Sequence, residues 1–259
     1  MIRLKNEKQI EGIRKSCHML SAMYTELIPL VKPGIQTIEI DRWVQNWIKK
    51  AGGRPAFLGV GHKRNPYPAS ICISLNDEVI HGIPSKRKIA SGDLVSLDCG
   101  IILDGYVSDQ AITLEAGKVS PEAHRLSTIT RECLYAGIRA AKAGGRLQLV
   151  SRAVQDHALE AGFGVVRDYC GHGVGFDLHE DPQVSNVPKG PNPRLSGGMV
   201  LAIEPMINAG SGDVEVLNDG WTVVTADSSL SAHWEHTIAI FADRTEILTE
   251  PVCGEMERI

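Results

Sequence analysis

Residues 95–109 read VSLDCGIILDGYVSD, and this stretch predicts a β-hairpin from which the rest of the fold can be built outward. Asp104 and Gly105 form a favoured two-residue turn, because both positions of such a turn take positive φ angles. If these two residues make the loop, Leu103 lies opposite Tyr106 and the two strands pair in a fixed register. The sequence therefore predicts which side chains share a face of the hairpin.

Two aspartates meet on one face of this predicted hairpin. In that register Asp98 lies opposite Ala111, and Asp109 lies two residues before Ala111 on the same face. The carboxylates are then diagonal neighbours, roughly 5–8 Å apart at their Cβ atoms. Like charges this close repel unless a cation lies between them, and a divalent metal is the simplest such cation. Two alternatives stay open: the aspartates lie on a solvated face, or a bulge in the turn reverses the parity.

Histidine and glutamates in the second half of the chain stand in motifs that favour the same kind of site. His172 lies among glycines in residues 169–175, YCGHGVG, and flanking glycine lets the backbone approach a ligand closely. Glu204 ends an apolar run before a proline, and Glu235 leads into another apolar run. Singly, each has a simpler interpretation, because a lone histidine more often completes a core hydrogen bond and a strand-end glutamate is commonly solvated.

The combination of these side chains carries more weight than any one of them. The candidate metal ligands are four carboxylates and one imidazole, from Asp98, Asp109, His172, Glu204 and Glu235. Two divalent cations would balance the four negative charges. Oxygen-rich ligation with one imidazole suits Mn, Fe, Co or Zn and differs from a closed thiolate zinc site. The six cysteines form no C-x2-C pair, and we expect them to be reduced.

Hydrophobic periodicity places helices and strands in the same order twice. Apolar residues at three- and four-residue steps predict helices that begin near Ile10, after Thr37, at Ser120 and near Leu147. Strands are expected at 70–75, 94–102 and 106–114, and again from Val165 onward. Residues 92–98 and 198–204 also share a glycine, an apolar run and a final carboxylate. The sequence therefore predicts one α+β domain over 1–259, with pseudo-symmetric halves at about 1–118 and 119–259.

Composition and charge exclude several classes of protein. With 43% hydrophobic and 22% charged residues, the chain has the balance of a globular domain rather than of a disordered one. A net charge of -4 without a basic stripe argues against nucleic acid as a partner. The apolar runs are too short to cross a membrane, and residues 1–11 are too polar for a secretory signal. We therefore expect a cytoplasmic protein that binds neither nucleic acid nor membrane.

Taken in order, these motifs resemble those of the methionine aminopeptidases, metallopeptidases of the pita-bread fold. The resemblance runs along nearly the whole chain and rests on HGIP at 81–84, LD at 97–98, SD at 108–109, CGHGVG at 170–175, HEDP at 179–182, EP at 204–205, DGW at 219–221 and EHT at 235–237. It implies an α+β pita-bread fold, in which helices cover a curved antiparallel sheet with two pseudo-symmetric halves. It also implies removal of the N-terminal methionine from nascent proteins by a metal-bridged hydroxide.

The resemblance assigns metal-binding roles to the five candidate ligands. In the matching positions Asp109 and Glu235 bridge two metal ions, Asp98 completes one, and His172 with Glu204 completes the other. The cofactors implied are two divalent ions, with Co, Mn, Fe and Zn as the candidates.

Catalytic and substrate-binding roles follow from the same resemblance. His81 and His179 are implied to contact the scissile peptide and its developing charge, and Glu204 is implied to take the proton of the attacking water. The residues expected to form the substrate pocket with these histidines are Tyr67, Cys72 and Trp221.

Two features depart from the family pattern. The pocket stretch at 58–68 is a few residues longer than usual, with an insertion around His62, and Val60 replaces an expected tyrosine. His233 stands where the family usually has glutamine, and on a strand it would share a face with Glu235. Both departures bear on substrate preference and pH dependence rather than on metal binding.

The spacing of the motifs fits the compact bacterial type I form, and two other functions stay open. The stretch between His172 and Glu204 is too short for the helical insertion of type II enzymes. The alternatives are an aminopeptidase of altered, X-Pro specificity and a binding homologue without catalysis. The expected partner is the N-terminal peptide of nascent proteins near the ribosome, and we expect the chain to act as a monomer.

Overall fold

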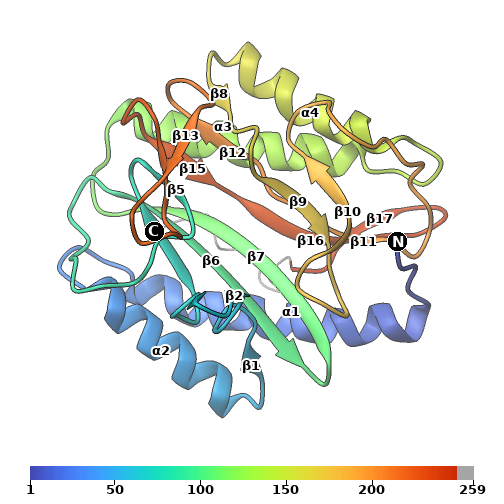
Figure 1. The fold of residues 1–259 in the computed structure, drawn as a ribbon, viewed down its shortest axis with the longest axis horizontal. Coiled ribbons are helices and arrows are strands. Elements are labelled where there is room, and N and C mark those ends of the chain that lie inside the picture. Colours follow the sequence, from blue (N-terminus) through green and yellow to red (C-terminus); the bar gives the residue numbers. More distant parts are fainter. Residues whose placement is uncertain (250–259) are drawn as a thin grey trace.

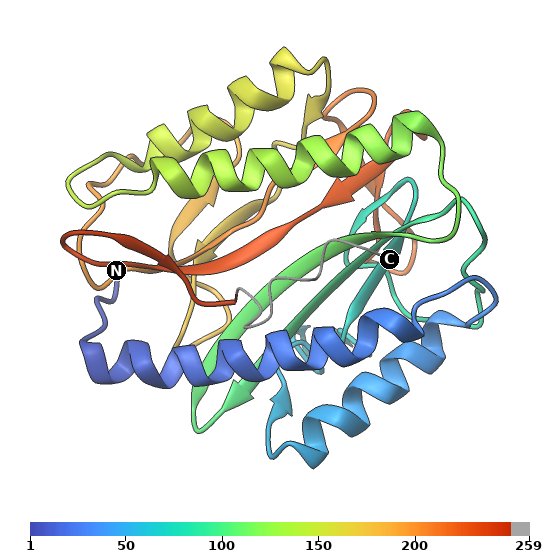
Figure 2. The ribbon, with the colours of Figure 1, turned by 180° about the vertical axis from the view of Figure 1, so that it is seen from behind.

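The computed structural model describes residues 1–249 of the chain. A curved antiparallel sheet runs through the middle of the molecule, and helices cover the face of it that is seen from behind (Figures 1 and 2). The helices of this part of the chain are α1 (Glu7–Leu27), α2 (Thr37–Lys50), α3 (Pro121–Ala140) and α4 (Leu147–Glu160), with a 3-10 turn at Ile28–Leu30. The predicted α+β class and the helix-covered curved sheet are therefore confirmed.

Strands that are far apart in the sequence lie side by side in the main sheet. Its order is β1-β6-β7-β16-β11-β9-β10, with β4 also paired to β6 and β17 to β16. The strands of this sheet are β1 (Arg54–Pro55), β4 (Cys72–Leu75), β6 (Leu94–Leu103), β7 (Tyr106–Glu115), β9 (Cys170–Gly173), β10 (Glu180–Ser185), β11 (Val200–Ile203), β16 (Glu235–Ile240) and β17 (Thr245–Ile247).

Three smaller sheets complete the described fold. They are ordered β15-β12-β8, β13-β14-β5 and β2-β3. Their strands are β2 (Gly61–His62), β3 (Asn65–Pro66), β5 (Glu78–Ile80), β8 (Gly164–Val165), β12 (Met206–Asn208), β13 (Val214–Val216), β14 (Val223–Thr225) and β15 (Ser231–His233). The helices and strands follow the order predicted from the periodicity; the division into halves near residue 118 falls between β7 and α3 and stays a prediction.

The β6–β7 hairpin has the predicted register. Leu103 pairs with Tyr106, and Asp98 pairs with Ala111. Asp104 and Gly105 have φ angles of 50° and 82°, as the two-residue turn requires. No bulge interrupts the ten paired positions, so the parity argument that places both aspartates on one face holds.

Side-chain caps and two apolar clusters account for the way the helices lie on the sheet. Asn6 accepts a hydrogen bond from the N–H of Gln9 at the start of α1, and Ser120 accepts one from Ala123 ahead of Pro121 at the start of α3. The buried face of α1 packs in a cluster with α2, β4 and β6, whereas α3 and α4 pack with β11 and β16. Each end of the sheet is thus held by its own pair of helices.

The central strands β7 and β16 pair over only two positions, and threonine hydroxyls hold them beyond that. Ala111 pairs with Glu235 and Gln110 with His236. On one side the Thr237 hydroxyl lies 3.2 Å from the Asp109 nitrogen and 2.7 Å from its carbonyl oxygen. On the other side the Thr113 hydroxyl bonds the backbone of His233 in the same double manner, at 3.0 and 2.7 Å. These hydroxyls replace backbone bonds where the strands diverge.

Tyr24 ties α1 to both strands of the hairpin. Its buried hydroxyl lies 3.1 Å from the carbonyl oxygen of Leu97 and 2.9 Å from that of Gln110. Leu97 immediately precedes Asp98, and Gln110 immediately follows Asp109. A single helix residue therefore fixes the backbone on each side of the two aspartates.

Replacing Tyr24 by phenylalanine should lower the free energy of unfolding by about 1–2 kcal/mol, because two buried carbonyl groups lose their shared donor. Tyr106→Phe is the matched control, since the Tyr106 hydroxyl makes no hydrogen bond within residues 1–249 and its loss should change stability little. Urea unfolding of both variants measures the difference. Equal stability of the two variants would contradict the clamping role of Tyr24.

Candidate metal centre

Five neighbouring strands each bring one candidate ligand to the same region. Asp98 is on β6, Asp109 on β7, Glu235 on β16 and His172 on β9, and Glu204 directly follows β11. These strands are consecutive in the sheet, in the order β6-β7-β16-β11-β9. Side chains of directly paired residues lie on the same face of a sheet. The strand order, which no local motif reveals, therefore gathers residues from 98 to 235 in one place.

Ala111 lies at the centre of this arrangement. It pairs with Asp98 on one side and with Glu235 on the other, and Asp109 is two residues away on the same strand face. Its methyl group is the smallest side chain that still has a Cβ, and it is fully buried. The three surrounding carboxylates consequently have free space between them.

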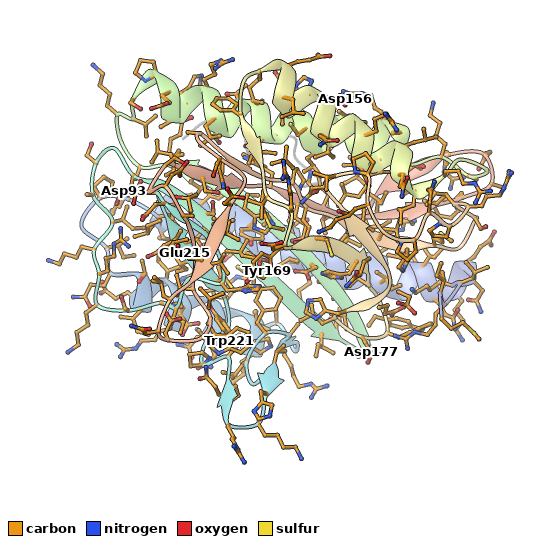
Figure 3. The ribbon with its side chains drawn as sticks, turned by 45° about the horizontal axis from the view of Figure 1, so that its top comes forward. Asp93, Asp156, Tyr169, Asp177, Glu215 and Trp221 are labelled. Atoms are coloured by element: carbon orange, nitrogen blue, oxygen red, sulfur yellow. The ribbon has the colours of Figure 1, made fainter. Side chains whose placement is uncertain are left out.

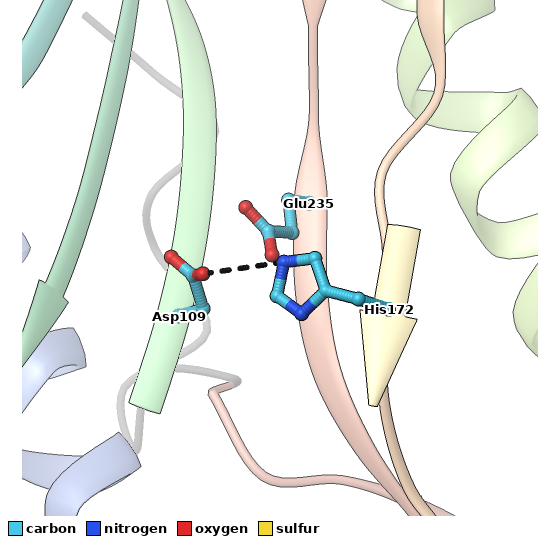
Figure 4. A group of neighbouring side chains, drawn as sticks. All are labelled: Asp109, His172 and Glu235. Carbon is cyan, nitrogen blue, oxygen red and sulfur yellow. Dashed lines mark ion pairs between the residues drawn. The ribbon is translucent and has the colours of Figure 1, made fainter. Parts of the chain in front are cut away.

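The ligand atoms of the predicted residues lie close to one another. His172 Nε2 is 3.3 Å from Glu204 Oε1 and 3.7 Å from Asp109 Oδ2. Ligand atoms of Asp109, His172 and Glu235 all lie within 4.8 Å of one another, and the three side chains point toward one another (Figure 4). One cation could therefore contact all three.

Burial of these carboxylates is not balanced by hydrogen bonds. Asp98 Oδ1, Asp109 Oδ1 and Glu235 Oε1 are buried and have no hydrogen-bond partner among the described residues. Such oxygens are costly unless a cation or a proton satisfies them. This shortage of protein donors, in a set of hard oxygen ligands and one imidazole, is what a divalent metal site requires.

The protein environment shifts the pKa of each candidate ligand in the direction that favours the neutral form of the group. Burial raises the pKa of Asp98 to about 8. Burial, followed by repulsion from neighbouring carboxylates, raises the pKa of Asp109, Glu204 and Glu235 well above its ordinary value. Burial and the nearby His179 lower the pKa of His172 to about 3. Without a cation, the site opposes its own ionisation.

A cavity of about 180 Å³ is lined by the five side chains and by all the other predicted site residues. These are His81, His179, Tyr67, Cys72 and Trp221. The centroid of the Trp221 ring lies 5.2 Å from that of Tyr67 and 6.0 Å from that of His81, and the His179 ring lies 4.4 Å from the His172 ring. Aromatic rings, a thiol and the carboxylates thus line the same cavity.

Sequence reasoning missed four residues that also line this cavity: Phe57, Ile80, Tyr169 and Leu178. Three of them directly precede a residue or motif that was singled out, because Ile80 precedes His81, Tyr169 precedes Cys170 and Leu178 precedes His179. Adjacency to a motif was therefore a usable signal. Phe57 carried no comparable sign.

His81 is held in an unusual backbone conformation. Its φ angle is 59°, in the left-handed region that side chains other than glycine seldom adopt. A Cβ on the next residue, Gly82, would lie 2.3 Å from the carbonyl oxygen of Ile73, so the chain must pass close to β4 at this point. Burial and the nearby His179 lower the pKa of His81 to about 4, so its imidazole is neutral at pH 7.

His233 reaches the candidate metal centre, although not along one continuous strand. The strand is interrupted at Trp234, so that His233 belongs to β15 and Glu235 to β16, in different sheets. His233 Nε2 nevertheless lies 3.8 Å from Glu204 Oε2, is buried, and makes no hydrogen bond within the described chain. The expectation that His233 neighbours the site therefore agrees with the structure, while the continuous strand assumed for it is wrong.

The long pocket stretch forms a small exposed hairpin beside the cavity. Strands β2 and β3 make this hairpin, and Trp221 lies where the hairpin leaves the body of the molecule (Figure 3). The Trp221 indole N–H donates to the Asn65 carbonyl oxygen at 3.1 Å. A Cβ on Gly61 would meet the Trp221 ring at 2.4 Å, so glycine allows this close contact.

Comparison with known proteins identifies the family. The model of metallopeptidase family M24 matches residues 11–242. The chain belongs to metallopeptidase family M24. It is 54% identical over 260 aligned positions to a methionine aminopeptidase of Treponema pallidum, covering 100% of this chain and 99% of that protein. It is 48% identical to one of Clostridium perfringens, covering 96% and 99% of the two chains.

Solved structures agree with this assignment. A methionine aminopeptidase from Rickettsia prowazekii superposes with a TM-score of 0.93 at 36% identity, covering 96% of this chain and 100% of that one. A prolidase from Pyrococcus furiosus shares the fold alone, with a TM-score of 0.78 at 24% identity, and this chain covers 65% of it. The pita-bread fold of these metallopeptidases is thereby confirmed, and members of the family use divalent metal.

Within residues 1–249, no helix is long and apolar enough to span a membrane.

Chelation of the metal should leave a protein whose stability falls as the pH rises from 7 to 8. Over this range the buried histidines His81, His172, His233 and His236 are neutral in the folded state, whereas Asp98, with a folded pKa of about 8, keeps a proton that it loses on unfolding. Each such carboxyl lowers the free energy of unfolding by up to about 1.4 kcal/mol per pH unit. Urea unfolding of the chelated protein at both pH values tests this. Added Mn²⁺ should restore stability, most strongly at pH 8, and a chelated protein that gains stability with pH would contradict the raised carboxyl pKa values.

Proposed function

We propose that this chain is an aminopeptidase that removes the N-terminal methionine from newly made proteins. The observation that carries this proposal is the convergence of four carboxylates and one imidazole in a cavity that aromatic rings and a thiol also line. Relatives named methionine aminopeptidase that align over 100% and 96% of the chain support it.

Two divalent ions are proposed, with Co, Mn, Fe and Zn as the candidates. Asp98, Asp109, His172, Glu204 and Glu235 would hold these ions. The four carboxylates balance four positive charges, and this balance removes the repulsion that otherwise raises their pKa values. Bound divalent cations supply an activated water and polarise the substrate carbonyl group.

Side chains of this protein provide the remaining steps. Glu204 accepts the proton of the water and returns it to the leaving amine, a role that its place in the cavity, 3.3 Å from His172 Nε2, allows. His179 and His81 face the same cavity and are proposed to stabilise the developing oxyanion and to contact the amide. A neutral His81 can donate one hydrogen bond without bringing a charge into the site.

The cavity walls suit a flexible thioether side chain. Tyr67, Cys72 and Trp221 are proposed to hold the methionine side chain, together with Phe57 and Tyr169. Thioether sulfur packs favourably against aromatic ring edges, and methionine adapts to irregular space. Cys72 is buried and its thiol pKa is raised by that burial, so it acts here as a small apolar group.

The alternative functions receive less support. Proline-directed enzymes share the fold at low identity, and the full-length relatives carry a different name. A binding homologue without catalysis would have no need to keep four buried acids at a stability cost. We also propose that the protein acts as a monomer in the cytoplasm on emerging chains near the ribosome, since these are the substrates of methionine removal.

Glu204→Gln should reduce turnover of a Met-Gly peptide by about 100-fold or more, because the glutamine amide cannot take the proton of the water. The assay uses added Co or Mn, and metal content is measured in parallel. Glu26→Gln, an exposed position on α1, is the matched control and should keep full activity. More than about a tenth of the original activity in Glu204→Gln would remove Glu204 from the base role, and cleavage of X-Pro peptides alone would support the proline-directed alternative.

A further inference from the structure

A buried ion pair connects the N-terminal segment to the loop that carries His179. Lys5 Nζ lies 2.7 Å from Glu180 Oε2, and each side chain is only 1% exposed. Lys5 precedes α1, while Glu180 opens β10, 175 positions farther along the chain. Glu180 directly follows His179, so this contact lies one residue away from a side chain of the cavity.

Glu180 also closes the loop on itself. Its Oε1 accepts hydrogen bonds from the backbone N–H groups of Phe176, at 2.7 Å, and Asp177, at 3.1 Å. Arg3 contacts the same oxygen at 3.0 Å and Asp177 Oδ2 at 2.6 Å. The carboxylate is thus the common acceptor for the loop backbone and for two N-terminal cations.

Two glycines give Lys5 its place against this loop. A Cβ on Gly198 would lie 2.7 Å from the Lys5 carbonyl oxygen, and the Lys5 N–H donates to the Gly198 carbonyl oxygen at 2.8 Å. A Cβ on Gly175 would lie 2.5 Å from Ile13 and 3.3 Å from Lys5 Cε. The last glycine of the CGHGVG motif therefore leaves room for α1 and the Lys5 side chain rather than for a ligand.

His179 has little else to hold it. Its imidazole makes no hydrogen bond with any residue in 1–249, and His179 is an exposed residue of the cavity lining. Its position is set by the backbone of the loop, which Glu180 fastens on one side and the His172 ring borders on the other. A loosened loop would displace this ring first.

We propose that Lys5 is a positioning residue, which holds Glu180 and thereby fixes His179 where the substrate's developing charge must be stabilised. The proposal rests on the aminopeptidase function proposed above. A group that serves the transition state affects kcat more than KM, whereas a group that binds the ground state affects KM. Lys5 should therefore control turnover from outside the cavity, without touching the substrate.

The neutral variant Lys5→Met removes the ammonium group and keeps most of the side-chain length. We expect kcat for a Met-Gly peptide to fall about tenfold or more, with KM changed less than about threefold, because small displacements of a catalytic group are costly. Lys8→Met, an exposed lysine in the first turn of α1, is the matched control and should leave both constants unchanged. Metal content should be the same in all three proteins.

A second measurement does not depend on activity. Amide hydrogen exchange should become faster at 175–180 in Lys5→Met, where Glu180 accepts the Phe176 and Asp177 N–H groups, while exchange in β6 and β7 stays unchanged. If the wild-type protein cleaves no methionine peptide, the proposed function fails, yet this exchange result still decides whether Lys5 orders the loop.

A double-mutant cycle separates positioning from general stabilisation. Glu180→Gln and Lys5→Met should have effects on kcat that are far from additive, because both act through one contact. If Lys5→Met does not fold, Lys5→Arg serves instead, since it keeps the charge and alters the geometry, and it should show the same kcat loss in milder form. Unchanged kcat in the folded variant, or faster exchange spread over the whole chain, would overturn the proposal.

Discussion

The structure depends on one electrostatic constraint, which is that four carboxylates are buried together on one face of the sheet. Taken alone, this arrangement opposes folding, because each acid loses hydration and repels the others. The apolar clusters under α1 and α2 at one end, and under α3 and α4 at the other, must offset that cost. The cost of burying the carboxylates is consequently not offset at the centre of the sheet itself, and a bound cation stabilises this region most.

The backbone keeps these acids in place at the seam between the two groups of strands. Only two residue pairs join β7 to β16, and one of them is Ala111 with Glu235. The hydroxyls of Thr113 and Thr237 then bond backbone groups across the widening gap. A fully paired seam would leave less room between the strands, whereas an unbridged one would leave backbone groups unsatisfied. Two threonines therefore let the sheet open enough to hold a site without losing its continuity.

The local sequence was sufficient to predict those parts of the structure that are determined by residues close together in the sequence. The Asp104-Gly105 turn fixed the register of β6 and β7, because a two-residue loop allows one pairing, and so it placed Asp98 and Asp109 on one face. The helix start at Ser120 followed in the same way from its cap. The candidate metal ligands of the second half were predicted through motifs and family resemblance, since each of them taken singly has a common structural explanation.

Long-range pairing could not be predicted from these patterns. Nothing near Glu235 indicates that β16 lies between β7 and β11, or that Ala111 becomes the centre of the site. The interruption at Trp234 was also hidden, because a continuous apolar and polar alternation conceals a change of sheet. The contact of Lys5 with Glu180 joins two charged residues that each look solvated in the sequence, and only burial distinguishes such a pair from surface charge.

His179 and Glu180, neighbours in the HEDP motif, contact different parts of the molecule. His179 faces the cavity, whereas Glu180 turns away from it toward Lys5 and the loop N–H groups. Glu180 Oε1 accepts from the N–H groups of Phe176 and Asp177, and Oε2 contacts Lys5, so both of its oxygens are already engaged away from the cavity. A carboxylate in such a motif is therefore better placed to anchor the backbone that holds the histidine than to bind metal. In this chain Glu180 pairs with the buried ammonium group of Lys5.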